Sequence, residues 1–271
     1  MRVAILLSMI LLFTPGTVAD ASPMENSYEG NPIIVINLTY EAGIGGGDDF
    51  EGEIVLELFL NWAPITVTNF VDLINQSFYD GIFFHRIIDD FVIQSGDPTC
   101  KTIIEYPLTN PLCGDEGSEE TIPFEANGNL THINGAIGMA RGAEPDSATS
   151  QFYICDGPQH GLDNGNRTFE GDPGYAVFGV VREGMELVQA AAAVPTTNNL
   201  DGGDELVPRV GTGLGDRPIY EVHINSITIR EYVPAQVVEK TDEKGLFGIS
   251  LSVSALSIIL TAIALSRKMN S

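Results

Sequence analysis

The alternation of apolar and polar positions divides the chain into a series of strands and two helices. Apolar runs rich in β-branched residues, bounded by Gly, Pro or Asp, predict strands. Apolar positions recur at helical spacing in residues 64–76 and again in 182–194, where Pro64 suits a first turn and Pro195 marks an end. The predicted strands occupy residues 33–40, 52–59, two segments within 83–97, 136–141, 150–155, 175–181 and 220–232.

This order of elements predicts one mainly all-β domain over residues 31–232. The strands do not alternate with helices, which argues against βαβ units. Eight strands with two helices favour an eight-stranded antiparallel β-barrel capped by two α-helices. At 271 residues and 44% hydrophobic content the chain can bury a full core, which excludes general disorder.

The amino-terminal residues are predicted to lie outside that domain. Residues 1–21 combine one basic residue, a short apolar stretch and small residues near position 20, which is the layout of a secretory signal peptide. An uncleaved anchor is the alternative, but the apolar stretch is short for a membrane span.

The carboxyl-terminal residues predict a single membrane-spanning helix. Residues 245–266 contain no charge and would extend about 33 Å as a helix, against a hydrocarbon core of about 30 Å. Basic residues in the tail, 267–271, favour a cytoplasmic end. We therefore expect a membrane-anchored, single-pass protein whose domain lies on the extracytoplasmic side, joined to the span by a polar tether, 233–244.

The charge balance argues against nucleic acid as a partner. The chain has 37 acidic and 13 basic residues, a formal net charge of −24. Binding to phosphates requires clustered Lys and Arg, and the sequence has no such cluster. The acidity indicates a well-solvated surface.

The cysteines and histidines predict a disulfide but no metal or cofactor. Cys100 and Cys113 flank a proline-containing loop, and a disulfide between them suits an oxidising compartment. Cys155 lies in an apolar strand and is expected to be a buried free thiol. There is no C-x-x-C pair, and the four histidines lack metal-ligand spacing. In DNGNRTFEGD, Arg167 falls where a calcium loop needs an oxygen ligand.

One apolar segment carries a charge that needs an explanation. In FFHRIIDDFVIQSGD, residues 83–97, Arg86 stands between two apolar runs. Burying an unpaired charge is costly, so Arg86 is either a paired core charge or the polar member of a pocket.

Three segments together resemble the cyclophilin-type peptidyl-prolyl cis/trans isomerases, and most closely their bacterial branch. They are residues 83–97, GAIGMARGAEPDSATSQFYI at 135–154 and GYAVFGVVREGM at 174–185, and the resemblance covers about residues 33–231. It implies an eight-stranded antiparallel barrel with two helices. It also implies isomerisation of X–Pro bonds in proline-containing peptides or unfolded proteins, without a cofactor.

The resemblance also implies a role for each site residue. Arg86, Gln94 and Phe91 take the catalytic positions, Arg86 being the hydrogen-bond donor to the substrate. The substrate-binding positions of the proline pocket and adjoining groove are Val92, Ala140, Arg141, Gln151, Tyr153, Leu162 and Tyr175. Because neighbouring strand residues point to opposite faces, Tyr153 is assigned to the pocket and Phe152 to the interior.

Several positions depart from the familiar eukaryotic pattern. Val92 replaces a Met, Tyr153 a Phe and Tyr175 a His. The Tyr153 hydroxyl requires a polar partner or water. Gly161 stands where that pattern has a Trp associated with tight cyclosporin binding, so weak binding of that drug is expected. The alternatives to an isomerase are a non-catalytic proline-peptide-binding chaperone and a module of a membrane complex.

Overall fold

The computed structural model describes residues 23–43, 45–101, 113–168, 170–197 and 215–231. They all fall within the first of two units of the chain, Met1–Pro234 and Ala235–Ser271. The predicted signal peptide, tether, membrane helix and tail lie outside the described residues. Within the described ranges, no helix has both the length and the apolar character needed to cross a membrane.

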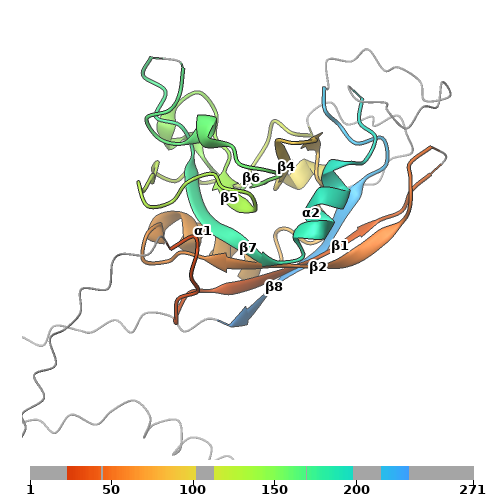
Figure 1. The fold of residues 1–271 in the computed structure, drawn as a ribbon, viewed down its shortest axis with the longest axis horizontal. Helices are drawn as coiled ribbons and strands as arrows, with labels where there is room; N and C mark the ends of the chain where they lie inside the picture. Colours follow the sequence, from red (N-terminus) through yellow and green to blue (C-terminus); the bar gives the residue numbers. More distant parts are fainter. Residues whose placement is uncertain (1–22, 44, 102–112, 169, 198–214, 232–271) are drawn as a thin grey trace, which may run out of the picture. The chain divides into compact units, whose positions relative to one another are not determined.

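The strands form one antiparallel sheet that curls on itself (Figure 1). Its order is β3-β4-β6-β5-β7-β2-β1-β8, and every ladder is antiparallel. The strands are β1 (Ile33–Tyr40), β2 (Phe50–Leu58), β3 (Arg86–Ile88), β4 (Val92–Ser95), β5 (Ala136–Met139), β6 (Phe152–Cys155), β7 (Ala176–Glu183) and β8 (Val222–Glu231).

The predicted barrel takes the form of this curled sheet, because the edge strands β3 and β8 share no regular ladder. The residues just before β3 instead meet β8 through an isolated bridge between Phe83 and His223. The Phe84 N–H donates to the Val222 carbonyl at 2.9 Å, and the Ile224 N–H donates to the Ile82 carbonyl at 2.8 Å. A strand of three residues, β3, is too short to continue this pairing as a ladder.

Helix α1 (Pro64–Asn75) begins with Pro64 in its first turn, as predicted. A distant side chain supplies its amino-terminal cap: the Glu125 carboxylate accepts the N–H groups of Ile65 at 3.1 Å and Thr66 at 2.9 Å. On its buried face Phe70 packs against the rings of Phe152 and Phe178, at 5.3 Å between centroids in both cases. This aromatic cluster fills the interior of the curl.

Helix α2 (Met185–Ala192) is shorter than the range predicted from the sequence. Strand β7 continues through Glu183, and Gly184 then takes a left-handed backbone conformation with φ 83°. Glycine adopts that conformation without the steric cost of a Cβ, so the chain turns there from strand to helix. Three short 3₁₀ helices complete the described elements: η1 (Pro98–Lys101), η2 (Pro145–Ser147) and η3 (His160–Leu162).

The cysteines divide as the sequence predicts. Cys100 and Cys113 form a disulfide across 13 positions of the chain. Cys155 on β6 is a buried free thiol, and burial raises its pKa to about 12. It therefore stays protonated and packs as a small apolar side chain.

Candidate active site

The hairpin of β3 and β4 places Arg86 directly opposite Gln94. The register pairs Arg86 with Gln94 and Ile87 with Ile93. Both isoleucines are buried, so the residues that alternate with them face outward from the curl. The turn is closed by Asp90, whose φ of 57° lies in the left-handed region that Asp tolerates. The apolar segment thus buries its isoleucines and presents Arg86 on the outer face.

Arg86 and Gln94 begin a row of outward-facing residues, the outward row, which continues from β4 onto β6 and β5. Gln94 is opposite Tyr153 on β6, and Tyr153 is opposite Gly138 on β5. A Cβ at Gly138 would lie 2.3 Å from the Tyr153 ring, so the ring lies over β5 only because Gly138 has no side chain. Phe152 points into the interior, as the alternation of the strand requires.

These side chains surround a pocket of about 250 Å³ on the outer face. The pocket contains nine of the ten residues that the sequence analysis assigned to the site, and one further residue, Arg167. Its lining consists of Arg86, Phe91, Val92, Gln94, Ala140, Arg141, Tyr153, Leu162, Arg167 and Tyr175.

Arg86 lies at the surface of this pocket and not in the core. Its side chain is 37% exposed. Its Nε lies 3.5 Å from a carboxylate oxygen of Asp216, and its guanidinium carbon lies 5.7 Å from the centre of the Phe91 ring. The carboxylate and the ring therefore hold the guanidinium while its remaining N–H groups stay available to a ligand.

Gln151, the tenth predicted residue, does not line the pocket but holds Gln94. It accepts a hydrogen bond from Gln94 Nε2 at 2.8 Å. Its own Nε2 donates to the carbonyls of Gly114 at 3.0 Å and Glu116 at 2.7 Å. Asp97 fixes the same loop by accepting both N–H groups, at 2.6 and 2.9 Å. Gln151 thus connects the outward row to the loop that follows the disulfide.

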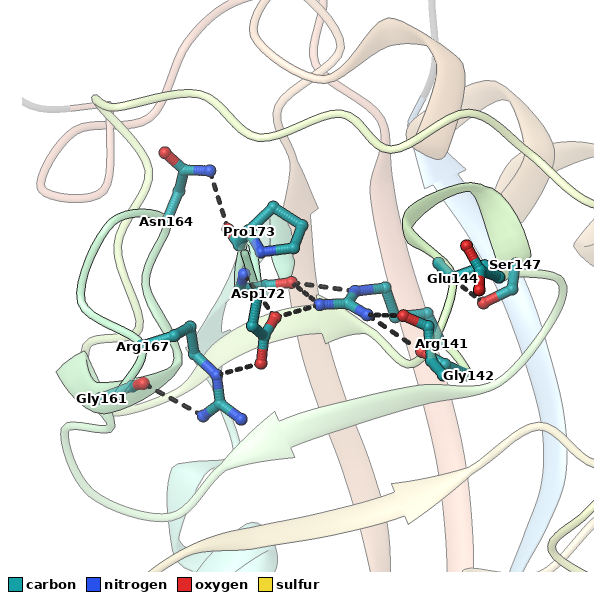
Figure 2. A network of polar contacts seen from close by, with 11 residues as sticks. Arg141, Gly142, Glu144, Ser147, Gly161, Asn164, Arg167, Asp172 and Pro173 are labelled. Atoms are coloured by element: carbon teal, nitrogen blue, oxygen red, sulfur yellow. Dashed lines mark hydrogen bonds and ion pairs between the residues drawn. The ribbon is translucent and has the colours of Figure 1, made fainter. Parts of the chain in front are cut away.

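Another part of the pocket wall is formed by two arginines that bind one carboxylate (Figure 2). Arg141 pairs with Asp172 and donates twice to the Gly174 carbonyl, at 3.0 and 2.8 Å. Arg167 donates from Nε to the other Asp172 oxygen at 2.8 Å. The hydrogen bond from Arg167, with others from the Gly174 N–H and Arg141, lowers the pKa of Asp172 to about 2.

The Tyr175 ring contacts both guanidinium groups of this cluster. Its centre lies 4.9 Å from the guanidinium carbon of Arg141 and 5.4 Å from that of Arg167. Arg141 is only 5% exposed, and it also donates to the carbonyls of Gly142 and Ala143. All these hydrogen bonds are made within the protein, so Arg141 stabilises the wall of the pocket.

The Tyr153 hydroxyl finds its polar partner in His132. The His132 Nε2 lies 2.7 Å from that hydroxyl, and its Nδ1 lies 2.6 Å from Asp163. Asp163 also accepts the His132 N–H at 2.7 Å and contacts His160 Nδ1 at 2.9 Å. Burial lowers the pKa of His132, so the ring is neutral near pH 7 and can link the hydroxyl to the carboxylate.

The sequence analysis missed Arg167 and His132. Arg167 was considered only as a misfit in a calcium loop, and it lies in a segment without regular periodicity. For His132 a signal existed, because the tyrosine at position 153 requires a polar partner. Which of the four histidines would supply it depends on tertiary structure.

Among the described residues, one group of carboxylates has the spacing to hold a metal ion, but none of its three members lines the pocket, although the Asp156 N–H donates to the carbonyl of the lining residue Phe91 at 2.9 Å. Asp89, Asp90 and Asp156 bring oxygen atoms within 4.8 Å of one another at the β3–β4 turn. Asp156 accepts the Asp90 N–H at 3.1 Å, which accounts for its position. We assign no cofactor to the pocket.

Comparisons with known proteins point to one family. The sequence model of the family described as cyclophilin type peptidyl-prolyl cis-trans isomerase/CLD matches residues 45–229. The peptidyl-prolyl cis-trans isomerase A of Dickeya dadantii is 41% identical over 147 residues, covering 54% of this chain and 70% of that protein. Isomerase B of Escherichia coli is 33% identical over 184 residues, covering 66% and 95%.

A solved structure shows the same fold. The crystal structure of a cyclophilin type peptidyl-prolyl cis-trans isomerase of Cryptosporidium parvum superposes with a TM-score of 0.54 at 23% identity, covering 75% of this chain and 99% of that one. A second structure of that protein, determined in the presence of the dipeptide Ala-Pro, gives a TM-score of 0.50 at 22% identity.

Proposed function

The chain belongs to the family of cyclophilin-type peptidyl-prolyl cis-trans isomerases and has their activity, and we propose that the pocket around Arg86 is its active site. The observation that carries this proposal is the register of β3 and β4, which sets Arg86 opposite Gln94 on the outer face. The presence of an Ala-Pro dipeptide with the Cryptosporidium relative supports proline as the ligand.

Isomerisation needs a donor aimed at the prolyl nitrogen. Rotation about a peptide bond faces a barrier of about 18–20 kcal/mol, because the planar amide is conjugated. In the twisted state the nitrogen loses this conjugation, and its lone pair can accept a hydrogen bond. A donor that binds the lone pair stabilises the twisted state more than either planar state, which lowers the barrier.

Arg86 meets the requirements for that donor. Its guanidinium carries five N–H groups and remains charged at all ordinary pH values. Asp216 and the Phe91 ring restrict its movement, so little reorganisation is needed when the substrate twists. Phe91, Val92 and Leu162 supply the apolar surface that holds the proline ring while the preceding residue turns.

The test is the isomerase activity of Arg86→Ala in the full chain, measured by exchange NMR on an X–Pro peptide. We expect kcat/KM to fall about 100-fold or more, the usual cost of removing one donor to a transition state. Arg230→Ala is the matched control, because Arg230 pairs with Glu53 on the surface of β8. Full activity in Arg86→Ala would refute the proposed role.

We also propose that the isomerase domain is exported and held at the membrane by residues 245–266. The signal-like pattern of residues 1–21, the uncharged span and the disulfide between Cys100 and Cys113 support this proposal. Its substrates would then be exported or unfolded chains. Protease added to intact cells should digest the domain, and replacing residues 245–266 with a polar linker should release it into the medium. Protection from the protease would contradict the proposal.

A further inference from the structure

The pocket wall has the opposite charge from the rest of the chain. The chain has 37 acidic against 13 basic residues. The ten residues that line the pocket include three arginines and no carboxylate. A binding site lined by positive side chains favours negatively charged ligands.

Of the three arginines, Arg167 is the one whose role the proposed mechanism leaves open. Arg86 is assigned to the prolyl nitrogen, and Arg141 is only 5% exposed and is bonded within the protein. The Arg167 side chain is 21% exposed. Figure 2 shows Nε directed at Asp172 and Nη1 at the Gly161 carbonyl, 2.8 and 3.2 Å away. These two bonds fix the guanidinium in place and leave its Nη2 group without a hydrogen bond to the described residues.

Two of the three arginines at the wall share one carboxylate. Arg86 pairs with Asp216, whereas Arg141 and Arg167 share the single carboxylate of Asp172. Arg167 therefore does not have the Asp172 carboxylate to itself. A third carboxylate, Asp163, lies next to Leu162 in the chain, and its two oxygens contact His132 and His160 and not Arg167.

There is also room beside Arg167 for a side chain of the substrate. Gly161, whose carbonyl Arg167 binds, is exposed, and a Cβ placed on it would meet no atom within 4 Å. A substrate group next to the proline can therefore approach the guanidinium from the side that Gly161 leaves open.

We propose that Arg167 determines specificity, and that it makes the enzyme prefer segments in which an Asp or Glu stands directly before or after the proline. This inference rests on the proposed function of the pocket. The net charge of −24 repels acidic peptides at long range. That repulsion is screened over about 8 Å at physiological ionic strength, whereas a direct carboxylate–guanidinium contact is not.

The experiment compares kcat/KM of the full chain on matched peptides that carry Glu, Gln or Lys before the proline, and on a second set with the substitution after it. We expect a Glu-to-Gln ratio of about two- to fivefold at one of the two positions, the range that a part-exposed ion pair supplies. Lys should be the poorest. In about 1 M salt, where screening acts over about 3 Å, the ratio should move towards one.

Arg167→Gln should abolish the preference, Arg167→Lys should keep part of it, and Arg230→Gln, remote from the pocket, should leave it unchanged. Because each ratio compares two peptides on one sample, a reduced folded fraction cancels. A wild-type ratio of one at both positions would overturn the proposal, and so would an unchanged ratio in Arg167→Gln. If the enzyme is active but lacks the preference, the role of Arg167 is refuted and the role of Arg86 as donor stands. If Arg86→Ala keeps full activity on the Gln peptides, the role of Arg86 is refuted and the role of Arg167 is not.

Discussion

At the scale of single residues, His85, just before β3, and Arg86, its first residue, show how two neighbours in the chain acquire different roles. Arg86 faces the pocket, whereas the His85 side chain is buried, and its Nδ1 has no hydrogen-bond partner among the described residues. Burial lowers the pKa of His85 from 6.5 to about 4; Asp97 opposes this shift, and Arg217 and Arg86 add to it. His85 is therefore neutral in the folded protein at pH 7.

This lowered pKa predicts that acid destabilises the domain through His85. The unfolded chain binds a proton at His85 as the pH falls below 6.5, while the folded chain does not until about pH 4. The free energy of unfolding should therefore fall by about 1.4 kcal/mol per pH unit between these values and then level off. In His85→Gln, denaturant titrations at several pH values should show a slope smaller by about one proton. An unchanged slope would contradict the assignment.

Residue roles divide into those that follow from sequence and those that need the fold. The alternation of the strand assigned Tyr153 and Phe152 to opposite faces, and the structure agrees. The parts played by Arg141 and Arg167 could not be predicted, because both depend on Asp172, which is 31 positions from one and 5 from the other. Only the tertiary structure shows that Arg141 makes most of its hydrogen bonds within the protein, whereas Arg167 keeps Nη2 without one to the described residues.

At the scale of elements, the polar link through His132 holds three separate segments at the pocket. It joins β6 through Tyr153, the segment before β5 through His132, and η3 through His160 and Asp163. Leu162, in the pocket wall, belongs to η3. The pocket therefore depends on one buried network for the relative position of its apolar wall and its tyrosine.

Tyr153→Phe tests the contribution of this network to stability. The substitution leaves the buried Nε2 of His132 without its partner, so the free energy of unfolding should fall by about 1–3 kcal/mol. Tyr175→Phe is the matched control: it lies in the same pocket, and no hydrogen bond joins its hydroxyl to the described residues. Urea denaturation of both variants measures the difference. Equal losses would show that the bond to His132 contributes nothing specific.

Element boundaries were predictable where one periodicity holds and less so where two elements meet. The predicted strand 33–40 coincides with β1, because its β-branched and alternating pattern continues over all eight residues. Residues 182–183 were assigned to a helix but belong to β7, since Gly184 and not the hydrophobic pattern marks the change. The open edge between β3 and β8 could not be foreseen, because it depends on how far a three-residue strand can pair.

At the scale of the whole molecule, the resemblance of three separated segments predicted the pocket better than any local pattern did. Those segments supply β3, β4, β5, β6 and β7, which the sheet brings next to one another. Gln151 shows the limit of this method. Its position in the chain matches the groove, but its side chain is bound to the carbonyls of Gly114 and Glu116, in a loop whose place the sequence does not specify.

The disulfide that precedes this loop is expected to stabilise the whole domain. Cys100 and Cys113 close a segment of 13 positions, so the bond restricts the unfolded chain and should contribute about 2–3 kcal/mol. It also holds the Cys113 carbonyl against the buried Arg217 guanidinium and brings Gly114 to Asp97 and Gln151. In the folded protein the disulfide thus helps to position the loop that binds Gln151, and Gln151 in turn holds Gln94.

The double variant Cys100→Ser, Cys113→Ser should therefore unfold at a lower urea concentration, with the free energy of unfolding reduced by about 2–3 kcal/mol. Reductant should lower the stability of the wild type by a similar amount and leave the double variant unchanged, because Cys155 is present and buried in both. If the wild type and the double variant unfolded at the same urea concentration without reductant, the disulfide would contribute no net stability, and the hydrogen bonds to Asp97 and Gln151 would be sufficient to hold the loop.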